Sequence, residues 1–289
     1  MNLRHLSARA AVAGVTTALA AGALVGLGTT AADAATGTAQ YTCTGAGGAV
    51  SLPLVVTAEA DLSGYPSFPT GSPIAAGLVS LTFTVTVPAP VVNVLMDDYH
   101  QTSIGGGSTD LAFPIGKGSV PIADFTIAPV TLVHDTAANL VKDPAVGDGL
   151  SNDAFKLPAP GAAKVTMPKS FTLTSLMDLT CTTADQPTIT TYTIAKQTAS
   201  VTAKAPKSVK KNKAFSVAVK VTGQTMATTG KVTAKVGKKV VGKGTLKKGK
   251  AAIKIKKGLK KTSKITIVYA GDKSTTGSSS FPVSVKVKK

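Results

Sequence analysis

The sequence predicts an all-β protein with two tandem β-sandwich domains. Segments in which apolar and polar residues alternate recur along the chain, and valine and threonine are common in them. This pattern is typical of half-buried strands. Glycine and proline separate the segments, as turns require. The balance of charge also changes sign near residue 190, which indicates two domains of different composition.

The first 34 residues have the three parts of an export signal. Arg4 and Arg9 precede an apolar stretch over residues 10–28, and the small-residue motif Ala32-Asp33-Ala34 follows it. This order predicts a cleaved signal peptide, residues 1–34. A retained membrane anchor is the alternative, but threonines and glycines dilute the apolar stretch. No later run reaches the roughly 18 apolar residues of a membrane helix, so we expect a secreted, extracellular protein, either released or held at the cell wall.

The chain has two cysteines, Cys43 and Cys181, both beyond the predicted cleavage site. An even count in an oxidising compartment predicts one disulfide. The cysteines lie near the two ends of region 36–185, so the bridge would join the first and last strands of that region. Neither shows Cys-x-x-Cys spacing, which disfavours a redox pair or half of a metal site.

The two predicted domains carry opposite charge. Residues 36–190 contain five lysines and twelve acidic residues, a net charge of −7, whereas residues 191–289 contain 25 lysines and Asp272 alone, a net charge of +24. We therefore predict an acidic domain at 36–185, a linker at 186–197 and a lysine-rich domain at 198–289.

Alternation with a period of two is clearest in the lysine-rich domain, at 215–221, 231–236, 250–256, 265–269 and 281–287. It predicts strands with valine and isoleucine facing a core and lysine facing water. In the last segment Phe281 alternates in phase with Val283, Val285 and Val287, so we assign it to the core. Glycine turns are expected between the strands, at Gly237, Gly249, Gly258 and Gly271.

The residues Tyr269-Ala270-Gly271-Asp272, with the Ser- and Thr-rich turn and Val-rich strand that follow, resemble the end of bacterial immunoglobulin-like repeats. The resemblance covers residues 198–289, implies an immunoglobulin-like sandwich and carries no activity. In such a turn Tyr269 would bury its ring and donate its hydroxyl to the backbone. Gly271 and Asp272 would complete the turn.

The lysines of this domain should project outward and form a cationic surface. Such a surface attracts polyanions through counterion release, and the expected partners are anionic cell-envelope polymers or other extracellular polyanions. A merely soluble surface is the alternative. Sequence-specific nucleic-acid recognition is disfavoured, because the aromatic residues of this region fall mostly on predicted core positions. The candidate contacts are Lys210, Lys211, Lys238, Lys239, Lys247, Lys248, Lys256, Lys257, Lys260 and Lys261.

Residues 237–243 spell Gly-x-x-x-x-Gly-Lys, like a phosphate-binding loop. Gly244 stands where such a loop has a magnesium-binding Ser or Thr, and no helix is predicted after it. We therefore predict a β-hairpin.

The acidic domain shows strand-like stretches at 50–58, 77–87, 120–133 and 163–181, while residues 90–100 fit either a helix or a strand. The settings Tyr41-Thr42-Cys43-Thr44 and Leu179-Thr180-Cys181-Thr182 are similar to those of a β-rich domain of uncharacterised function in exported actinobacterial proteins. No activity comes with this resemblance.

Two groups in the acidic domain could carry chemistry, Asp97-Asp98 with His100 and the pair His134-Asp135. Asp148, Asn152 and Asp153 lie in a loop that calcium could use, although their spacing is not that of an EF-hand. No hydrolase motif accompanies them, so we predict no catalytic residue, metal or cofactor. The expected function is a non-catalytic surface protein. The alternatives are an adhesin or glycan-binding module with its site on the acidic domain, and an extracellular hydrolase using His100 or His134.

Overall fold

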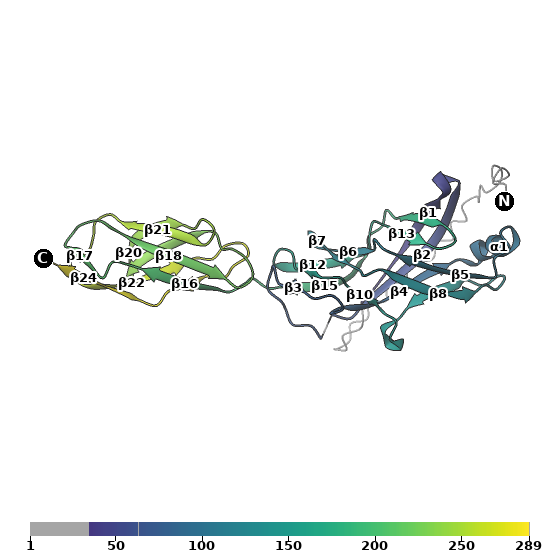
Figure 1. Cartoon of the computed structure of the whole chain (residues 1–289), viewed down its shortest axis with the longest axis horizontal. Coiled ribbons are helices and arrows are strands. Elements are labelled where there is room, and N and C mark those ends of the chain that lie inside the picture. Colours follow the sequence, from purple (N-terminus) through teal and green to yellow (C-terminus); the bar gives the residue numbers. More distant parts are fainter. Residues whose placement is uncertain (1–34, 63, 289) are drawn as a thin grey trace, which may run out of the picture.

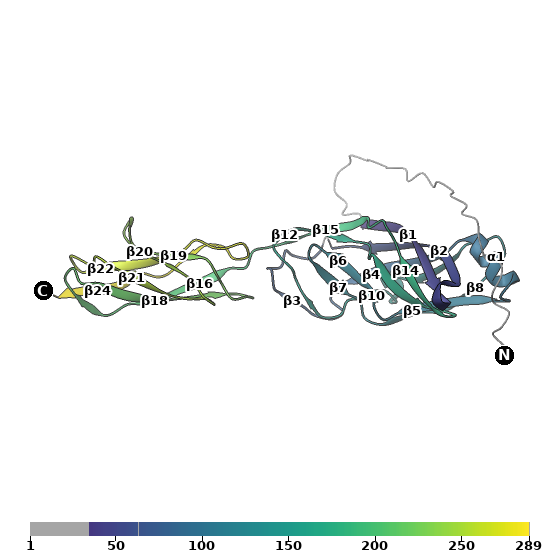
Figure 2. The ribbon, with the colours of Figure 1, turned by 90° about the horizontal axis from the view of Figure 1, so that it is seen from above.

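A computed structural model describes residues 35–62 and 64–288, which form two all-β units lying end to end (Figures 1 and 2). We call residues 35–194 the acidic unit and residues 199–288 the basic unit. The predicted all-β fold class, with two tandem sandwiches, is confirmed. The predicted signal peptide lies outside the described residues.

The acidic unit contains one short α-helix and two short 3-10 helices among its strands. The α-helix falls in the stretch that the sequence left undecided, and the strand-like stretches 120–133 and 163–181 each divide into separate strands. In chain order the elements are β1 (Ala35–Gly45), η1 (Ala46–Gly48), β2 (Val50–Ala60), β3 (Pro73–Ile74), β4 (Ser80–Val87), α1 (Ala89–Asp97), β5 (Ser103–Ser108), β6 (Ala112–Ile115), β7 (Gly118–Pro121), β8 (Phe125–Thr131), β9 (Ala138–Lys142), η2 (Pro144–Val146), β10 (Leu150–Ser151), β11 (Phe155–Lys156), β12 (Gly161–Thr166), β13 (Ser170–Thr174), β14 (Asp178–Thr182) and β15 (Thr188–Ile194).

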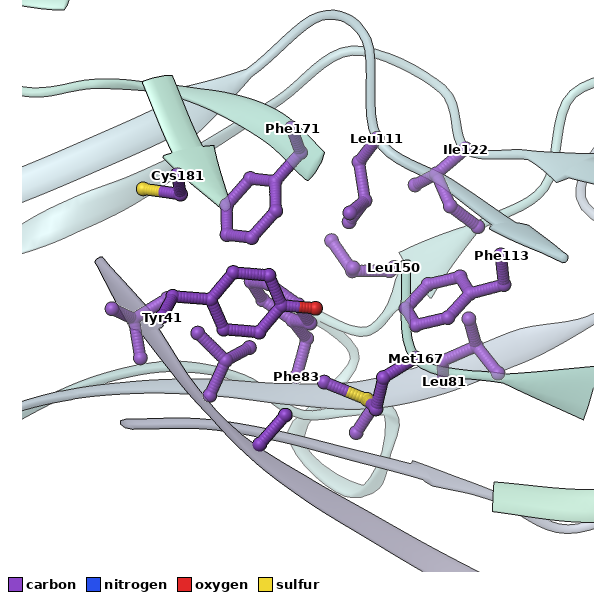
Figure 3. Packing of buried hydrophobic residues seen from close by; sticks show 14 of the residues in the cluster. Tyr41, Leu81, Phe83, Leu111, Phe113, Ile122, Leu150, Met167, Phe171 and Cys181 are labelled. Atoms are coloured by element: carbon purple, nitrogen blue, oxygen red, sulfur yellow. The ribbon is translucent and has the colours of Figure 1, made fainter. Parts of the chain in front are cut away.

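The large sheet of the acidic unit has the strand order β10-β4-β2-β1-β14-β13-β5-β8, with β9 also paired to β4. A smaller sheet, β15-β12-β6-β7, packs against it through β1 and β15. Between them, Tyr41, Phe83, Phe113 and Phe171 meet edge to face, with ring centroids 5.2 to 6.5 Å apart (Figure 3). Such edge-on contacts stabilise a core beyond the apolar area that they bury.

The disulfide joins Cys43 to Cys181 as predicted. The two cysteines lie directly opposite each other on the antiparallel strands β1 and β14. The bridge therefore links neighbouring strands of the large sheet, although the last strand of the unit is β15 and not β14.

The predicted linker at 186–197 lies mostly inside the acidic unit. Its residues Thr188–Ile194 form β15, which pairs with β12, and Ile189, Tyr192 and Ile194 are buried in the acidic core. The polar threonines of this strand face outward and give the segment its linker-like composition.

The basic unit is a sandwich of two sheets. One has the order β16-β18-β21 and the other β17-β24-β22-β19-β20, with β23 also paired to β22. The valines and isoleucines of both sheets point inward and form a core separate from that of the acidic unit. Its strands are β16 (Ala199–Lys204), β17 (Ser208–Lys210), β18 (Phe215–Gly223), β19 (Lys231–Val236), β20 (Lys239–Thr245), β21 (Lys250–Ile255), β22 (Ser263–Tyr269), β23 (Ser278–Ser279) and β24 (Val283–Lys288).

Phe281 departs from the predicted core assignment, because its side chain is 93% exposed. Ser280 hydrogen-bonds to Ile267, while Val283 pairs with Ile265. Two residues, Phe281 and Pro282, therefore occupy the place of one opposite Thr266. This bulge shifts the inward-outward phase by one residue, and Pro282 cannot donate to the strand ladder there.

Gln197 connects the two units and is fully buried. Its side-chain oxygen accepts hydrogen bonds from the backbone N–H groups of Thr225 and Met226, both at 2.9 Å, and its amide nitrogen donates to the Thr275 hydroxyl at 3.0 Å. The Thr225 hydroxyl in turn donates to the carbonyl of Thr70 in the acidic unit at 2.6 Å. The junction is thus fixed by specific hydrogen bonds.

Candidate functional site

The lysines of the basic unit form an exposed and unpaired cationic surface. Every lysine from Lys196 to Lys288 is exposed, except Lys235, which is half-buried. Within residues 35–62 and 64–288 the ion pairs are His134–Asp97 and Lys142–Asp148, both in the acidic unit. Neither of these pairs includes a lysine of the basic unit, so the positive charge of this unit is available to an external partner.

Eight of the ten predicted lysine contacts gather at the end of the basic unit farthest from the acidic unit. There the loop 210–213 contacts the loop 256–262: Asn212 donates its backbone N–H to the carbonyl of Leu259 at 3.0 Å. The β19–β20 hairpin turn lies at the same end of the sheet, because β19 runs antiparallel to β22: Val232 near the start of β19 pairs with Tyr269 at the end of β22, so the end of β19 lies toward the start of β22.

We call residues 210–213, 237–239 and 256–261 the distal tip; it lies beside β17 and the C-terminal end of β24 (Figure 1). Its lysines are Lys210, Lys211, Lys213, Lys238, Lys239, Lys256, Lys257, Lys260 and Lys261. Loops far apart in sequence thus place nine like charges on one small surface.

Lys247 and Lys248 do not join this cluster and lie at the opposite end, next to the junction. Lys248 lines a hollow of about 320 Å³ there, together with Lys220 and Lys250. The structure therefore divides the predicted lysines into a larger distal group and a smaller group at the junction.

The segment that spells Gly-x-x-x-x-Gly-Lys is the β19–β20 hairpin, as predicted, with Gly237 in its turn at a φ of 56°. A Cβ atom on Gly242 would lie 2.6 Å from Cγ2 of Ile253. The second glycine of the motif therefore allows β20 to approach β21 closely, which explains it without a phosphate ligand.

The turn after β22 is built around Asp272, the single acidic residue of region 191–289. Its carboxylate accepts hydrogen bonds from the Thr229 hydroxyl at 2.7 Å, the Thr229 backbone N–H at 3.0 Å and the Ser274 backbone N–H at 2.9 Å. Burial by itself raises the pKa of Asp272, but these hydrogen bonds outweigh it and hold the pKa well below its ordinary value. Gly271 has a φ of 86°, a conformation that favours glycine.

Tyr269 buries its ring as expected, but its hydroxyl makes no well-formed hydrogen bond to the backbone of the described residues; the side chains of Thr275 and Asp272 are the polar groups that act on it. Burial raises the pKa of this phenol. In the acidic unit, by contrast, the buried Tyr41 hydroxyl donates to the carbonyl of Pro168 at 2.5 Å.

The candidate catalytic residues of the acidic unit lie on its surface around α1. His134 and Asp97 form an exposed ion pair, with Nε2 and Oδ1 3.4 Å apart. His100 adopts a φ of 51° just after α1, where Gln101 donates its N–H to the carbonyl of Leu95 at 2.9 Å. His100 is thus part of the hydrogen-bonded turn that follows the end of α1, so its position has a structural explanation.

The potential calcium ligands have other roles in the loop. Asn152 is buried, accepts a hydrogen bond from the Val79 N–H at 2.7 Å and donates to the carbonyl of Ala75 at 2.9 Å. Asp148 pairs with Lys142. Across the described part of the chain, no group of three or more His, Cys, Asp or Glu side chains is arranged to hold a metal ion.

The acidic unit also holds an apolar cavity of about 60 Å³ beneath the segment that leads from β2 to β3. Tyr65 and Tyr192 line it, but their hydroxyls bond to the carbonyls of Leu78 and Pro66, at 2.6 and 2.5 Å, and so point to backbone. Neither His100 nor His134 lines this cavity. It therefore offers no polar group that could recognise a sugar or activate water.

None of the helices in residues 35–62 and 64–288 has the length and apolar character to span a membrane.

Comparison with known proteins supports the fold of the basic unit. Residues 201–288 match the family model of the bacterial Ig-like domain (group 3). No curated protein matches the chain. Among solved structures, the fibronectin(III)-like modules of CbhA from Clostridium thermocellum match at 14% identity and a TM-score of 0.25, over 80% of this chain and 92% of that chain. The basic unit is therefore similar to bacterial immunoglobulin-like domains over nearly its whole length, as the Tyr269–Asp272 turn predicted.

Proposed function

We propose that this chain is a non-catalytic, exported cell-surface protein whose basic unit docks on anionic polymers of the cell envelope. The observation that carries the proposal is the exposed lysine surface, which no described acid neutralises. A highly soluble domain needs only a modest net charge of either sign. A charge of +24 over residues 191–289, with a single acid, is more than solubility requires.

The type of cation indicates how such a polymer would be held. The chain has only Arg4 and Arg9 as arginines, both in the predicted signal peptide. Lysine ammonium groups act as mobile, hydrated point charges, whereas the planar fork of arginine suits fixed two-point recognition. The basic unit is therefore suited to follow a flexible polyanion through many weak contacts, which salt would weaken together.

The distal tip is the proposed main contact. It concentrates nine lysines at the end away from the acidic unit, so a bound polymer would leave the acidic unit projecting outward. The acidic unit, with its disulfide, then serves as the displayed part. The disulfide and the Ig-like domain are both consistent with an extracellular location.

The test is sedimentation of the purified chain, without residues 1–34, with isolated bacterial cell walls. We expect the protein to pellet at about 20 mM salt and to be released at about 500 mM, because higher salt shortens the range of electrostatic attraction. A protein that stays in the supernatant at low salt would contradict charge-based docking. Walls stripped of their anionic polymers should capture less protein.

Two variants with the same change of charge locate the contact. The tip variant replaces Lys256, Lys257, Lys260 and Lys261 with glutamine; the junction variant does the same at Lys220, Lys247, Lys248 and Lys250. All eight side chains are exposed, so both variants should fold. We expect the tip variant to be released at clearly lower salt than the junction variant. Equal release would show that net charge matters and that the tip does not.

A further inference from the structure

Phe281 is the most exposed large apolar side chain in the described part of the chain, at 93%. The other aromatic residues of the basic unit, Phe215 and Tyr269, are half-buried and buried. A whole aromatic ring in water gains nothing for the stability of the fold. Packing of the fold therefore does not explain the exposed ring, and its surroundings decide what it could bind.

The bulge directs Phe281 to the outer face of the six-stranded sheet that contains β22 and β24. Thr266, the residue opposite it, alternates with the buried Ile265 and Ile267 and so faces outward. Residues opposite each other on paired strands share a face. On its other side Thr266 pairs with Lys235 of β19, so a lysine lies two strands from the phenyl ring on the same face.

Further lysines surround this position. Lys264 is the next outward residue of β22, and it pairs with the exposed Ser284 of β24. Lys286 is the next outward residue of β24. Outward residues on one strand repeat about every 7 Å and neighbouring strands lie about 5 Å apart. By this spacing Lys235 and Lys264 lie roughly 10 Å from Phe281 and Lys286 about 14 Å, and neither ion pair of the described residues includes any of the three.

We propose that Phe281 is a stacking platform for the sugar rings of an anionic glycan, whose charged groups the surrounding lysines hold. This inference rests on the proposed function and names the class of polymer. A pyranose ring presents an apolar face of C–H groups that packs on an aromatic ring, while its acidic substituents reach outward. Lys235 and Lys264 are the nearest outward cations on the neighbouring strands, and Lys286 follows farther along β24.

The surroundings favour a glycan over nucleic acid or a membrane. Proteins that bind single-stranded nucleic acid stack successive bases on several aromatic residues, whereas this face offers one. Insertion into a membrane uses a continuous apolar surface, whereas Thr266, Ser279 and Ser284 are the outward neighbours of Phe281. A single aromatic ring flanked by lysines is suited to stack one sugar ring of an anionic glycan at a time.

The experiment compares two polyanions, one that contains sugar rings and one that does not. Labelled dextran sulfate has pyranose rings and polyphosphate has none, and the affinity of the full chain for each is measured by fluorescence anisotropy at one salt concentration. We expect Phe281→Ala to weaken dextran sulfate binding about tenfold, or about 1.4 kcal/mol, and to leave polyphosphate binding unchanged. Phe281→Tyr should restore binding. Val240→Ala, at an exposed valine on the edge strand β20, is the matched apolar control and should have no effect.

Each other outcome overturns the inference in a distinct way. If wild type binds both polymers and Phe281→Ala changes neither, or both equally, the stacking role is wrong while docking by charge stands. If wild type binds neither, the proposed function fails and this inference fails with it. If Phe281→Ala weakened binding only to oligothymidylate, or only to phosphatidylglycerol vesicles, the ligand of Phe281 would be a nucleic acid or a membrane surface and not a glycan. The thermal midpoint of Phe281→Ala should match that of wild type, because the side chain is exposed.

Discussion

The acidic and basic units are both β-sandwiches with aliphatic cores, but they are stabilised differently. The acidic unit adds edge-to-face aromatic contacts around Phe83 and the Cys43–Cys181 disulfide. The basic unit has neither among its described residues, and it carries an excess of unpaired positive charge. One unit of the chain thus holds the disulfide and the aromatic contacts that add stability, and the other holds most of the positive charge. This difference predicts that the two units respond to different reagents.

Removal of the disulfide should have the largest effect, and only on the acidic unit. The bridge spans 138 positions of sequence, and its loss from an exported domain typically costs about 2–5 kcal/mol. We expect Cys43→Ser with Cys181→Ser to lower the unfolding temperature of the acidic unit by roughly 4–20 °C. Calorimetry with hydrogen-exchange mass spectrometry would assign each transition. A comparable drop in the basic unit would show that the units unfold as one.

Tyr41 and Tyr269 provide the next test, because both are almost completely buried but only the Tyr41 hydroxyl makes a well-formed hydrogen bond. Tyr41→Phe leaves the carbonyl of Pro168 without its partner and should destabilise the acidic unit by about 1–3 kcal/mol. Tyr269→Phe removes a hydroxyl that has no well-formed hydrogen bond, only looser contacts with the side chains of Thr275 and Asp272, so the basic unit should lose less than about 0.5 kcal/mol or become slightly more stable. Urea unfolding of both variants measures the difference. Equal losses would indicate that the Tyr269 hydroxyl is bonded in solution.

Sequence patterns predicted which faces of most strands are buried, because a period of two directly reflects the geometry of a strand. They failed at Phe281, where a bulge inserts one residue and reverses the phase. They also failed at β15, whose outward threonines resemble a linker. Both errors have the same cause: pairing with a distant strand decides the outcome, and local composition does not report it.

The sequence predicted only part of the candidate site, and the rest was missed for a related reason. Composition showed that the lysines would be numerous and outward. It could not show that the loops at 210–213 and 256–262 meet, or that Lys247 and Lys248 lie at the other end, because these placements depend on the register of strands far apart in sequence. The buried role of Gln197 was missed, and a single glutamine between two domains gives no signal in sequence.

Asp272 should make the basic unit sensitive to acid. Its pKa in the folded state lies below the ordinary value of 3.8, so its contribution to stability is complete above about pH 4 and is lost as the pH falls through the folded pKa. Since Asp272 is the single acidic residue in region 191–289, Asp272→Asn should remove most of this pH dependence. The variant should also be less stable at neutral pH by about 1–2 kcal/mol, as hydrogen bonds to a charged group are lost.

Thermal unfolding of wild type and Asp272→Asn between about pH 2 and pH 7 measures this effect, since both the folded pKa and the ordinary value lie below neutrality. The acidic unit is an internal control, because its own carboxylates, among them Asp110 with a lowered pKa, should keep its acid sensitivity in both proteins. If the basic unit of Asp272→Asn kept the acid sensitivity of wild type, the titration of the Asp272 carboxylate would not be its cause.

Ionic strength should have the smallest effect and should act mainly on the basic unit. Its exposed lysines repel one another in the folded state, and a net charge far from zero destabilises a compact fold. Raising the salt from about 20 to 500 mM shortens the screening length from roughly 20 Å to less than 5 Å, which is less than the spacing of alternate lysines along a strand. We therefore expect the melting temperature of the basic unit to rise by a few degrees, which corresponds to about 0.5–1 kcal/mol of stability, while that of the acidic unit hardly changes.

Chloride and fluoride at equal concentration should act alike, because screening depends on ionic strength and not on the identity of the anion. An equal rise in both units would show that the unpaired lysines cost the basic unit no stability, and the contrast between the units would then reduce to the disulfide and the aromatic core.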